Sequence, residues 1–341
     1  MIRHLDRPTV AAAVLISTFA LAGCVGQLSS LAPHVPTQVA LFNKVAGSPA
    51  SCLTISCMYV TDRNTNAVTA YAQSGKGNVA PVTAISGSNT LLSSPVGIFA
   101  DSNHDVHVAN YGGNTVTVYA AGDTGNVAPM QTIAGSHTLL NGPDSVALDA
   151  GGVSYVANWS ANSLTVYAAG AHGDVKPIRT ISGAKTLLSG PVGIAVDAGN
   201  KLYVADLLSS AVTVFAARAK GNVAPIRAIS GSNTQLNGPG GVAVDAGGKI
   251  YVANSYGNSI TVYAAGATGN VAPIRTISGA KTGLTYPTQV ALDSRRFIYV
   301  TNRDANSVTV YASKAKGNAA PVRTISGSNT LLNSPAGISL R

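Results

Sequence analysis

One proline recurs along this chain at a constant spacing, and that spacing limits what the chain can fold into. It lies within variants of the phrase GNVAPIRTISG, 48 residues apart each time, at Pro81, Pro129, Pro177, Pro225, Pro273 and Pro321. A period this regular is produced by copies of one supersecondary unit that are stacked or arranged in a ring. The sequence therefore predicts a repeat protein built from 48-residue units.

Each unit contains four runs that suit short β-strands, as the copy beginning at Pro191 illustrates. The run 193–196 is apolar throughout, as expected of a strand buried on both faces. The runs 201–205, 211–216 and 226–229 follow, and the middle one alternates small polar and apolar residues. The chain contains no Glu, and good surface-helix formers are scarce, which argues against a helical solenoid. Four short antiparallel strands per unit are typical of a β-propeller blade.

The number of units predicts the number of blades. The second strand carries the same signature six times, beginning at Tyr59, His107, Tyr155, Tyr203, Tyr251 and Tyr299. We therefore predict an all-β fold, a six-bladed β-propeller of four-stranded antiparallel blades. A further first strand at 335–341 ends the chain, and we expect it to close the ring beside the strand at Tyr59, because it would otherwise be an unpaired edge. The alternative closing strand is 36–41, which repeats 287–292 letter for letter.

The first residues differ in composition from the repeats. Two arginines precede an apolar run at 10–20, which is short for a membrane span and typical of an export signal. The LAGC sequence at 21–24 resembles the bacterial lipobox, whose Cys receives lipid and becomes the new first residue. We predict a lipoprotein signal peptide at 1–23, lipidation at Cys24, a tether at 24–35 and the propeller at 36–341. The alternative is an ordinary signal peptide with a chance Cys.

The net charge indicates which neighbours the exported protein would meet. Cleavage would remove Arg3, Asp6 and Arg7 and lower the formal charge from +9 to +8. Such a charge favours anionic neighbours, for example lipopolysaccharide, phospholipid or acidic glycans. Nucleic acid is not expected, because the cationic residues are spread through the repeats of an exported chain. We expect a monomer in the cell envelope, at the outer membrane or the cell surface, attached to the membrane by its lipid alone.

The remaining cysteines agree with export. Once Cys24 is lipidated, Cys52 and Cys57 are left, five residues apart. In an oxidising compartment this spacing predicts a local disulfide. A metal site is the alternative, but no His lies nearby in the sequence to complete it.

Each second strand ends in Asp or Asn, and in a propeller these ends surround the mouth of the central channel. The residues are Asp62, Asn110, Asn158, Asp206, Asn254 and Asn302. In one interpretation each side chain caps the turn that follows it by binding the local backbone. In the other they hold a metal ion at the axis, where Asp and Asn oxygens favour calcium over zinc. No other cofactor is expected.

Positions at which the copies disagree suggest a ligand site. Arg63, Tyr111, Trp159 and Arg303 directly follow residues of that ring, and Trp159 is the only Trp of the chain. Near the starts of the first strands, Asp144, Thr288 and Gln289 replace the usual Val or Gly. Aromatic rings, arginines and a carboxylate on one face suit a sugar, a peptide or an acidic ligand. The alternative is neutral drift on an exposed rim.

The repeat itself resembles a known family. The pattern P-x-G-I-A-V-D-x-G-x-x-L-Y-V-A-D, followed by V-T-V-F, is similar to the NHL repeat of six-bladed propellers, and YVTN at 299–302 matches the motif of bacterial YVTN propellers. The resemblance covers roughly 58–341 and implies a propeller, whose relatives include protein-binding, RNA-binding, lyase and lactonase members. The fourth strand and return loop are longer here than in the usual unit. Related gluconolactonases use a Glu ligand, which this chain lacks.

We therefore expect an exported, lipid-anchored propeller that acts as a binding or scaffolding module for a glycan, peptide or envelope protein. One alternative is a calcium-dependent channel-type hydrolase or lyase, lactonase-like, in which Asp144 and Asp206 could pair across the channel. A second alternative is a purely structural surface protein. No catalytic residue is assigned, because the His residues share no repeated placement that would serve a serine triad.

Overall fold

The computed structural model of the protein describes residues 52–341, all of which belong to one compact unit, Gly47–Arg341. The predicted signal peptide at 1–23, the lipidation site Cys24, the tether at 24–35 and the alternative closing strand at 36–41 lie outside the described residues. Among residues 52–341, no helix has the length and apolar character needed to cross a membrane.

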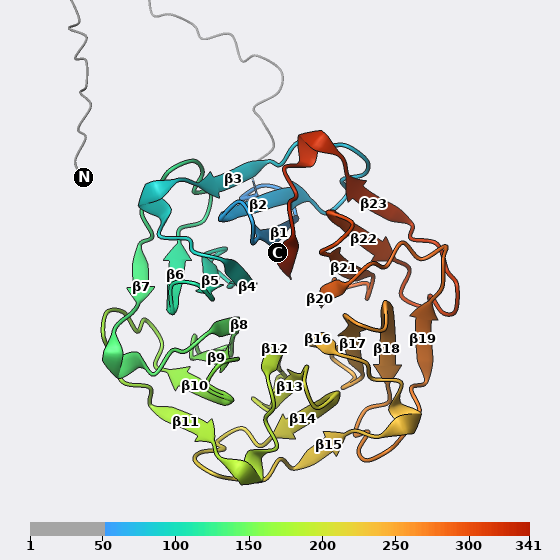
Figure 1. The fold of residues 1–341 in the computed structure, drawn as a ribbon. Helices are drawn as coiled ribbons and strands as arrows, with labels where there is room; N and C mark the ends of the chain where they lie inside the picture. The colour runs from blue at the N-terminus through green and yellow to red at the C-terminus, as the bar shows by residue number, and fades with distance from the viewer. Residues whose placement is uncertain (1–51) are drawn as a thin grey trace, which may run out of the picture. The chain divides into compact units, whose positions relative to one another are not determined.

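Six sheets of four antiparallel strands surround a central axis, which confirms the predicted six-bladed propeller (Figure 1). From the axis outward, blade 1 is β24 (Pro335–Leu340), β1 (Cys57–Asp62), β2 (Ala67–Ala72) and β3 (Thr83–Ser86). Blade 2 is β4 (Pro95–Ala100), β5 (Val106–Asn110), β6 (Thr115–Tyr119) and β7 (Gln131–Ile133). Blade 3 is β8 (Pro143–Leu148), β9 (Ser154–Asn158), β10 (Ser163–Tyr167) and β11 (Arg179–Ser182).

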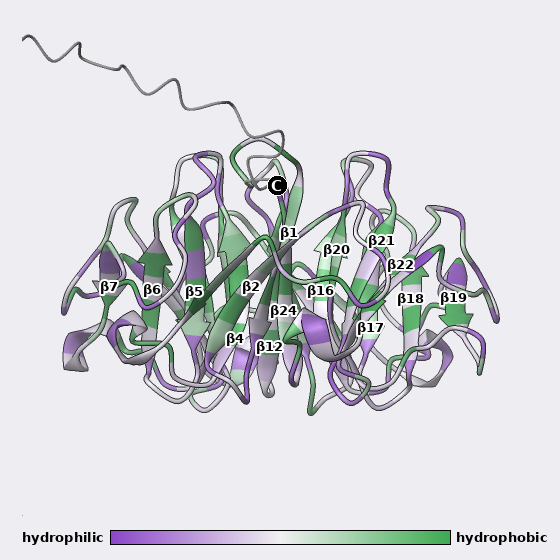
Figure 2. Cartoon of the chain, turned by 90° about the horizontal axis from the view of Figure 1, so that it is seen from above, coloured by the Kyte–Doolittle hydropathy of each residue, from purple (hydrophilic) through white to green (hydrophobic). Residues whose placement is uncertain are grey.

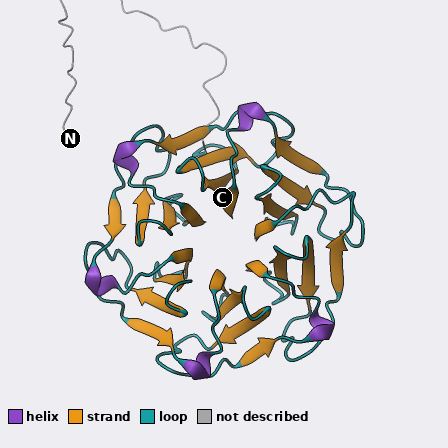
Figure 3. Cartoon of the chain, in the orientation of Figure 1, coloured by secondary structure: helices purple, strands orange, loops and turns teal. Residues whose placement is uncertain are grey.

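The other three blades repeat this order. Blade 4 is β12 (Pro191–Val196), β13 (Leu202–Asp206), β14 (Ala211–Phe215) and β15 (Arg227–Ile229). Blade 5 is β16 (Pro239–Val244), β17 (Ile250–Asn254), β18 (Ser259–Tyr263) and β19 (Arg275–Ser278). Blade 6 is β20 (Pro287–Leu292), β21 (Ile298–Asn302), β22 (Ser307–Tyr311) and β23 (Arg323–Ser326). Figure 3 shows short 3-10 helices on the outer circumference, η1 (Ser88–Thr90), η2 (Ser136–Thr138), η3 (Ala184–Thr186), η4 (Ser232–Thr234) and η5 (Ser328–Thr330).

The C-terminal strand closes the ring. β24 lies antiparallel to β1, with Met58 opposite Leu340 and Val60 opposite Ile338. At its end, the N–H of Cys57 donates to the carbonyl of Arg341 at 2.6 Å, and the N–H of Arg341 donates to the carbonyl of Cys57 at 2.9 Å. The prediction that this strand, rather than 36–41, takes the innermost position is confirmed. Cys57 also forms a disulfide with Cys52, which lies at the start of the described chain beside this closure.

The hydrophobic core lies between neighbouring blades. Val212 and Val214 of β14 are fully buried and belong to one cluster with Val252 and Tyr263 of blade 5. Figure 2 shows the same separation of character, with apolar bands in the strands and polar residues in the loops. Because each sheet must cover both of its faces, a blade is stabilised by its two neighbours rather than by itself.

The long loop between the third and fourth strands of each blade forms hydrogen bonds with the outermost strand of the preceding blade. Gly173 of blade 3 forms a parallel bridge with Ile133 of β7, and its N–H donates to the carbonyl of Thr132 at 2.7 Å. The equivalent bridge between Gly77 and Ile325 crosses the point at which the ring closes. This contact accounts for the extra length of the loop, and it covers part of an outer edge that could otherwise pair with another sheet.

Candidate functional site

The Asp or Asn at the end of each second strand is buried inside its own blade. Asn110 Oδ1 accepts the N–H of Ser93 at 3.2 Å, and Asn110 Nδ2 donates to Thr117 Oγ1 at 3.0 Å. A loop N–H and a Thr hydroxyl hold every one of these side chains in the same way. The six are Asp62, Asn110, Asn158, Asp206, Asn254 and Asn302.

These contacts correct both interpretations of the ring. The side chains do not cap the turn that follows them, because the N–H that each one binds belongs to the loop entering the blade's first strand. They also turn away from the axis, toward a Thr on the third strand. Among the described residues, no group of three or more His, Cys, Asp or Glu side chains is placed to hold a metal ion. The predicted calcium ligands therefore serve as loop supports in this structure.

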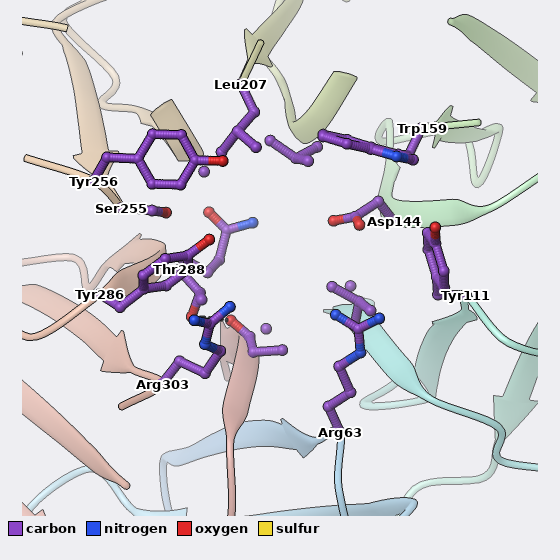
Figure 4. A pocket seen from close by; sticks show the side chains of 17 residues that line it. Arg63, Tyr111, Asp144, Trp159, Leu207, Ser255, Tyr256, Tyr286, Thr288 and Arg303 are labelled. Carbon is purple, nitrogen blue, oxygen red and sulfur yellow. Dashed lines mark hydrogen bonds between the residues drawn. The ribbon is translucent and has the colours of Figure 1, made fainter. Parts of the chain in front are cut away.

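An axial pocket of about 300 Å³ opens on the face where the second strands end. Side chains from all six blades point toward its centre, as Figure 4 shows. The pocket brings together every residue for which the sequence predicted ligand contact, namely Arg63, Tyr111, Asp144, Trp159, Thr288, Gln289 and Arg303. Its wall is completed by Leu207, Ser255, Tyr256 and Tyr286. The residues on which the copies disagree thus form one site instead of a scattered rim.

One backbone hydrogen bond positions this wall in each blade. The residue after the buried Asp or Asn donates its N–H to the carbonyl of the residue just before the first strand, as Trp159 does to Gly142 at 2.9 Å and Arg303 does to Tyr286 at 3.2 Å. This backbone hydrogen bond forms in every blade, whichever side chain the donor residue carries. Substitution at this position therefore changes the chemistry of the wall while the scaffold stays constant.

Closely packed first strands form the floor of the pocket. A Cβ on Gly193 would lie 2.7 Å from the carbonyl oxygen of Gly240, and one on Gly337 would collide with the carbonyl of Val96. Glycine allows neighbouring innermost strands to approach this closely. The floor therefore consists of backbone and small side chains, and the larger polar groups lie above it on the wall.

Three polar side chains of the lining are already engaged by the protein. Thr288 Oγ1 contacts Thr301 Oγ1 at 2.9 Å and donates to the carbonyl of Ala336 at 2.8 Å. Ser255 Oγ donates to the carbonyl of Pro287 at 2.8 Å, and Gln289 Oε1 accepts the N–H of Val290 at 3.0 Å. Thr288 thus ties β20 to β21 and β24, whereas Gln289 binds the backbone of its own strand; both were predicted ligand contacts and both line the pocket.

Asp144 is the one carboxylate of the pocket lining, and no hydrogen bond engages it within the described residues. Burial raises the pKa of Asp144 to about 7, while the nearby guanidinium of Arg63 acts in the opposite direction. Arg63 in turn lies over the ring of Tyr111, 5.1 Å from its centroid. A carboxyl group that ionises near neutral pH can accept a hydrogen bond from a ligand hydroxyl or take a proton from water. The carboxylate pair considered with Asp206 is not formed, because Asp206 is buried within blade 4.

Two aromatic residues of the wall, Tyr256 and Tyr286, are absent from the predicted set. Their rings make an edge-to-face contact with centroids 5.9 Å apart, and the guanidinium of Arg303 lies 3.4 Å from the centroid of Tyr286. Tyr286 occupies the position before the strand-opening proline, where the other copies have only Ser or Gly. That disagreement between copies is a signal in the sequence that could have identified it.

Comparison with known proteins agrees with the propeller fold. Similar solved structures include a nidogen/laminin complex (TM-score 0.58, 14% identity, covering 84% of this chain and 98% of that chain) and a streptogramin B lyase (0.54, 14%, 83% and 83%). A putative 6-phosphogluconolactonase from Bacteroides uniformis is also similar (0.56, 17%, 84% and 85%). At these identities the likeness shows the fold alone.

No curated protein matches the sequence. The family model described as lactonase, 7-bladed beta-propeller, matches residues 37–327, which is well over half of the chain. The described residues form six blades, so this chain differs from the family description in blade number. The protein therefore belongs to the lactonase family of β-propellers.

Proposed function

We propose that the axial pocket binds a small, ring-shaped, polyhydroxylated ligand, a sugar or a sugar lactone. The observation that carries this proposal is the composition of the wall, which combines four aromatic rings with unengaged hydrogen-bonding groups around a single cavity of about 300 Å³. Aromatic faces pack against the apolar faces of sugar rings, and a few placed polar groups then fix the hydroxyls. A cavity of this size lies at the lower end of the range for small-molecule sites and suits one sugar ring.

Trp159 provides a direct test, because the only Trp of the chain lines the pocket. Titration of the protein with D-glucose, D-galactose, D-glucuronate and D-gluconolactone should give a saturable change in Trp159 emission for at least one of them. The Tyr111→Ala variant should weaken that binding, whereas Lys185→Gln, on exposed η3, should not. The absence of a saturable change with every compound, together with an unchanged melting temperature, would reject a sugar site.

Hydrolysis of a lactone is a second candidate function, favoured by one observation. Asp144 faces the cavity with a pKa of about 7, near the operating pH of a general base, and Arg63 provides a cation beside it. In this reaction Asp144 takes a proton from water as the water oxygen bonds to the lactone carbonyl carbon. The ring C–O bond then breaks, and the departing alkoxide takes the proton back from Asp144, giving the hydroxy acid. The family description and the lactonase neighbour support the same chemistry.

The pH profile of D-gluconolactone opening tests this second function. After subtraction of the spontaneous rate, activity should rise through about pH 7, because the ionised form of Asp144 is the base. Asp144→Asn should reduce the rate to background. Arg63→Gln should move the midpoint to higher pH, since Arg63 lowers the pKa of Asp144. A rate in Asp144→Asn equal to that of the wild type would leave binding as the sole function.

We further propose that the protein acts in the cell envelope, where the site serves as a binding module for an envelope glycan or a glycan-bearing partner. The LAGC sequence ending at Cys24 and the disulfide between Cys52 and Cys57 support export to an oxidising compartment. The YVTN motif at 299–302 supports a YVTN-type repeat. Incorporation of labelled fatty acid and membrane fractionation test the anchor: Cys24→Ser should remove the label and release the protein. Equal labelling of both forms would exclude Cys24 as the lipidation site.

A further inference from the structure

We infer that Arg303 makes the axial pocket selective for a ligand that carries a carboxylate, so that the preferred sugar is a uronic or aldonic acid. The inference rests on the proposed function and specifies the class of its ligand. Arg303 presents the outer edge of its guanidinium to the cavity, and that edge binds the ligand carboxylate through two parallel N–H···O hydrogen bonds. Arginine suits this contact because its planar fork matches the two oxygens of a carboxylate.

The guanidinium of Arg303 is held in place before any ligand arrives. Its Nε donates to Asp304 Oδ1 at 2.8 Å, and its plane stacks on Tyr286, 3.4 Å from the ring centroid. The Tyr286 side chain is also a hydrogen-bond partner of Arg303, and Figure 4 shows the guanidinium directed into the pocket. A fork that is already oriented loses little conformational entropy on binding, which increases its affinity for a carboxylate.

Arg63 is the counterpart of Arg303 in the adjacent blade, and it lacks this support. The N–H of Arg63 donates to the carbonyl of Ser334, where the N–H of Arg303 donates to the carbonyl of Tyr286, so blade 1 has a Ser at the position of the Tyr286 ring. Arg63 instead lies over Tyr111 of blade 2 at 5.1 Å, and its charge acts on Asp144. Of the two arginines of the pocket, Arg303 is therefore the one arranged for an incoming anion.

The platform under Arg303 is present at a conformational cost. Tyr286 has a φ of 48°, in the left-handed region, whereas the other five copies place Gly or Ser at this position. A bulky residue in that region is uncommon and disfavoured. The Tyr on which Arg303 stacks is therefore a feature of blade 6 that the other copies do not share.

The placement also orients the ligand. Arg303 and Asp144 lie on different sides of the pocket in Figure 4, with the aromatic residues around them. A carboxylate bound to Arg303 keeps the acidic end of the sugar away from Asp144, whose own ionised form would repel it. The hydroxyl-bearing end then meets Asp144 and Arg63, where a carboxylate acceptor suits hydroxyl donors.

Two ligands that differ only in their charge test the inference. D-glucuronate and D-glucuronamide have the same ring and hydroxyls, and the amide removes the negative charge. Calorimetric titration of the wild type should show D-glucuronate binding about tenfold or more tightly than D-glucuronamide, as expected for a charge-assisted bidentate pair. In Arg303→Gln this preference should vanish while D-glucuronamide still binds.

Further variants distinguish the planar, two-pronged geometry of the Arg303 guanidinium from its positive charge. Arg303→Lys keeps the charge but loses the fork, and it should retain only part of the preference. Tyr286→Ser restores the residue type of other copies; it removes one aromatic face from the wall for both ligands, and it should weaken D-glucuronate binding several-fold more than D-glucuronamide binding. Lys281→Gln, an exposed cation of the loop that leads into blade 6, is the control for net charge and should leave both affinities unchanged.

The outcomes distinguish this inference from the proposed function. Equal affinity for the two ligands in the wild type, or a preference that persists in Arg303→Gln, would overturn the assignment of Arg303 and leave a neutral sugar site. Failure of both ligands, and of D-glucose and D-galactose, would overturn the sugar site itself and with it this inference.

Discussion

At the scale of single residues, one structural slot is filled by Asn in four blades and by Asp in two. Asp206 accepts hydrogen bonds from Ser189 N–H at 3.2 Å and Thr213 Oγ1 at 2.8 Å, so both of its neighbours donate. Burial nonetheless raises the pKa of Asp206, and that of Asp62, to about 7. This buried position therefore disfavours a charged side chain. The Asn of the other four blades makes the equivalent hydrogen bonds and is uncharged.

We predict that Asp206→Asn and Asp62→Asn stabilise the protein at alkaline pH. The folded state keeps the proton of each Asp up to about pH 7, whereas the unfolded chain loses it near pH 4. The stabilisation that comes from the protonated form is complete below pH 4 and is lost as pH rises through 7. Each variant should therefore match the wild type near pH 4 and exceed it at pH 8 by roughly 4 kcal/mol, the free-energy equivalent of a pKa raised from about 4 to about 7.

Urea unfolding at pH 4, 6 and 8 measures this difference. Asn254→Asp is the reverse substitution in blade 5, and it should destabilise at pH 8 with little effect at pH 4. A constant difference between Asp206→Asn and wild type across this range would show that folding does not raise the pKa of the carboxyl.

At the scale of elements, the closing strand is held by packing and hydrogen bonds rather than by chain continuity. A side chain on Gly337 of β24 would collide with the carbonyl of Val96, and one on Gly193 of β12 would lie 2.7 Å from the carbonyl oxygen of Gly240. The crowding is similar, but β24 follows β23 of blade 6 in the sequence and is joined to blade 1 through its pairing with β1. β12 leads by a short turn into β13, its partner in the same blade, and is held there by the chain as well.

We predict different consequences for Gly337→Val and Gly193→Val. Both should lose about 2 kcal/mol or more of stability through overpacking. Only Gly337→Val should in addition release the C-terminal segment, which limited proteolysis and mass spectrometry would detect as early cleavage near 335–341. Gly151→Ala, in an exposed turn, is the control and should behave as wild type. Equal C-terminal cleavage in the two valine variants would contradict a separately released strand.

The disulfide beside the closure should contribute modestly. Cys52 and Cys57 enclose a short loop, and a loop of this length accounts for only about 2 kcal/mol of reduced entropy in the unfolded chain. Cys52→Ser/Cys57→Ser should therefore lower the unfolding free energy by about that amount and still fold into the propeller. Wild type in reducing buffer should move toward the variant. An unchanged midpoint in both cases would show that the disulfide does not stabilise the fold.

Most of the strands could be predicted because each copy repeats the same sequence motif. Six blades were predicted from the strand-like runs and from the proline before each first strand. The closure of the ring was predicted from the extra first strand at the end of the sequence. The partners of the buried Asp and Asn could not be predicted, because the loop N–H that each binds comes from a different part of the blade. The candidate ligand-binding residues were the positions at which the copies differ. Tyr286 is another such position, so comparing the six copies at every position would have identified it as well.

At the scale of the whole molecule, the ring is nearly symmetric in shape and strongly asymmetric in charge. Residues 95–142, which span blade 2, contain three Asp and no Lys or Arg. Residues 287–334, which span blade 6, contain six Lys or Arg and two Asp. The backbone is the same in each blade, but the charge is not. The electrostatic potential is therefore more positive around blade 6 than around blade 2, which the fold alone does not require.

Blade 6 should therefore face an anionic surface, such as the acidic glycans or phospholipids of an envelope. Its loops expose Arg295, Arg296, Lys314 and Lys316, and replacing these four by Gln should elute the protein from a heparin column at clearly lower salt. A matched variant with Lys176, Lys185, Arg218 and Lys220 replaced by Gln removes the same charge from blades 3 and 4. If binding depends on where the charge lies, only the blade 6 variant should lose most of its retention. Equal losses would mean that net charge alone governs the interaction, and that the asymmetry of the ring does not orient it.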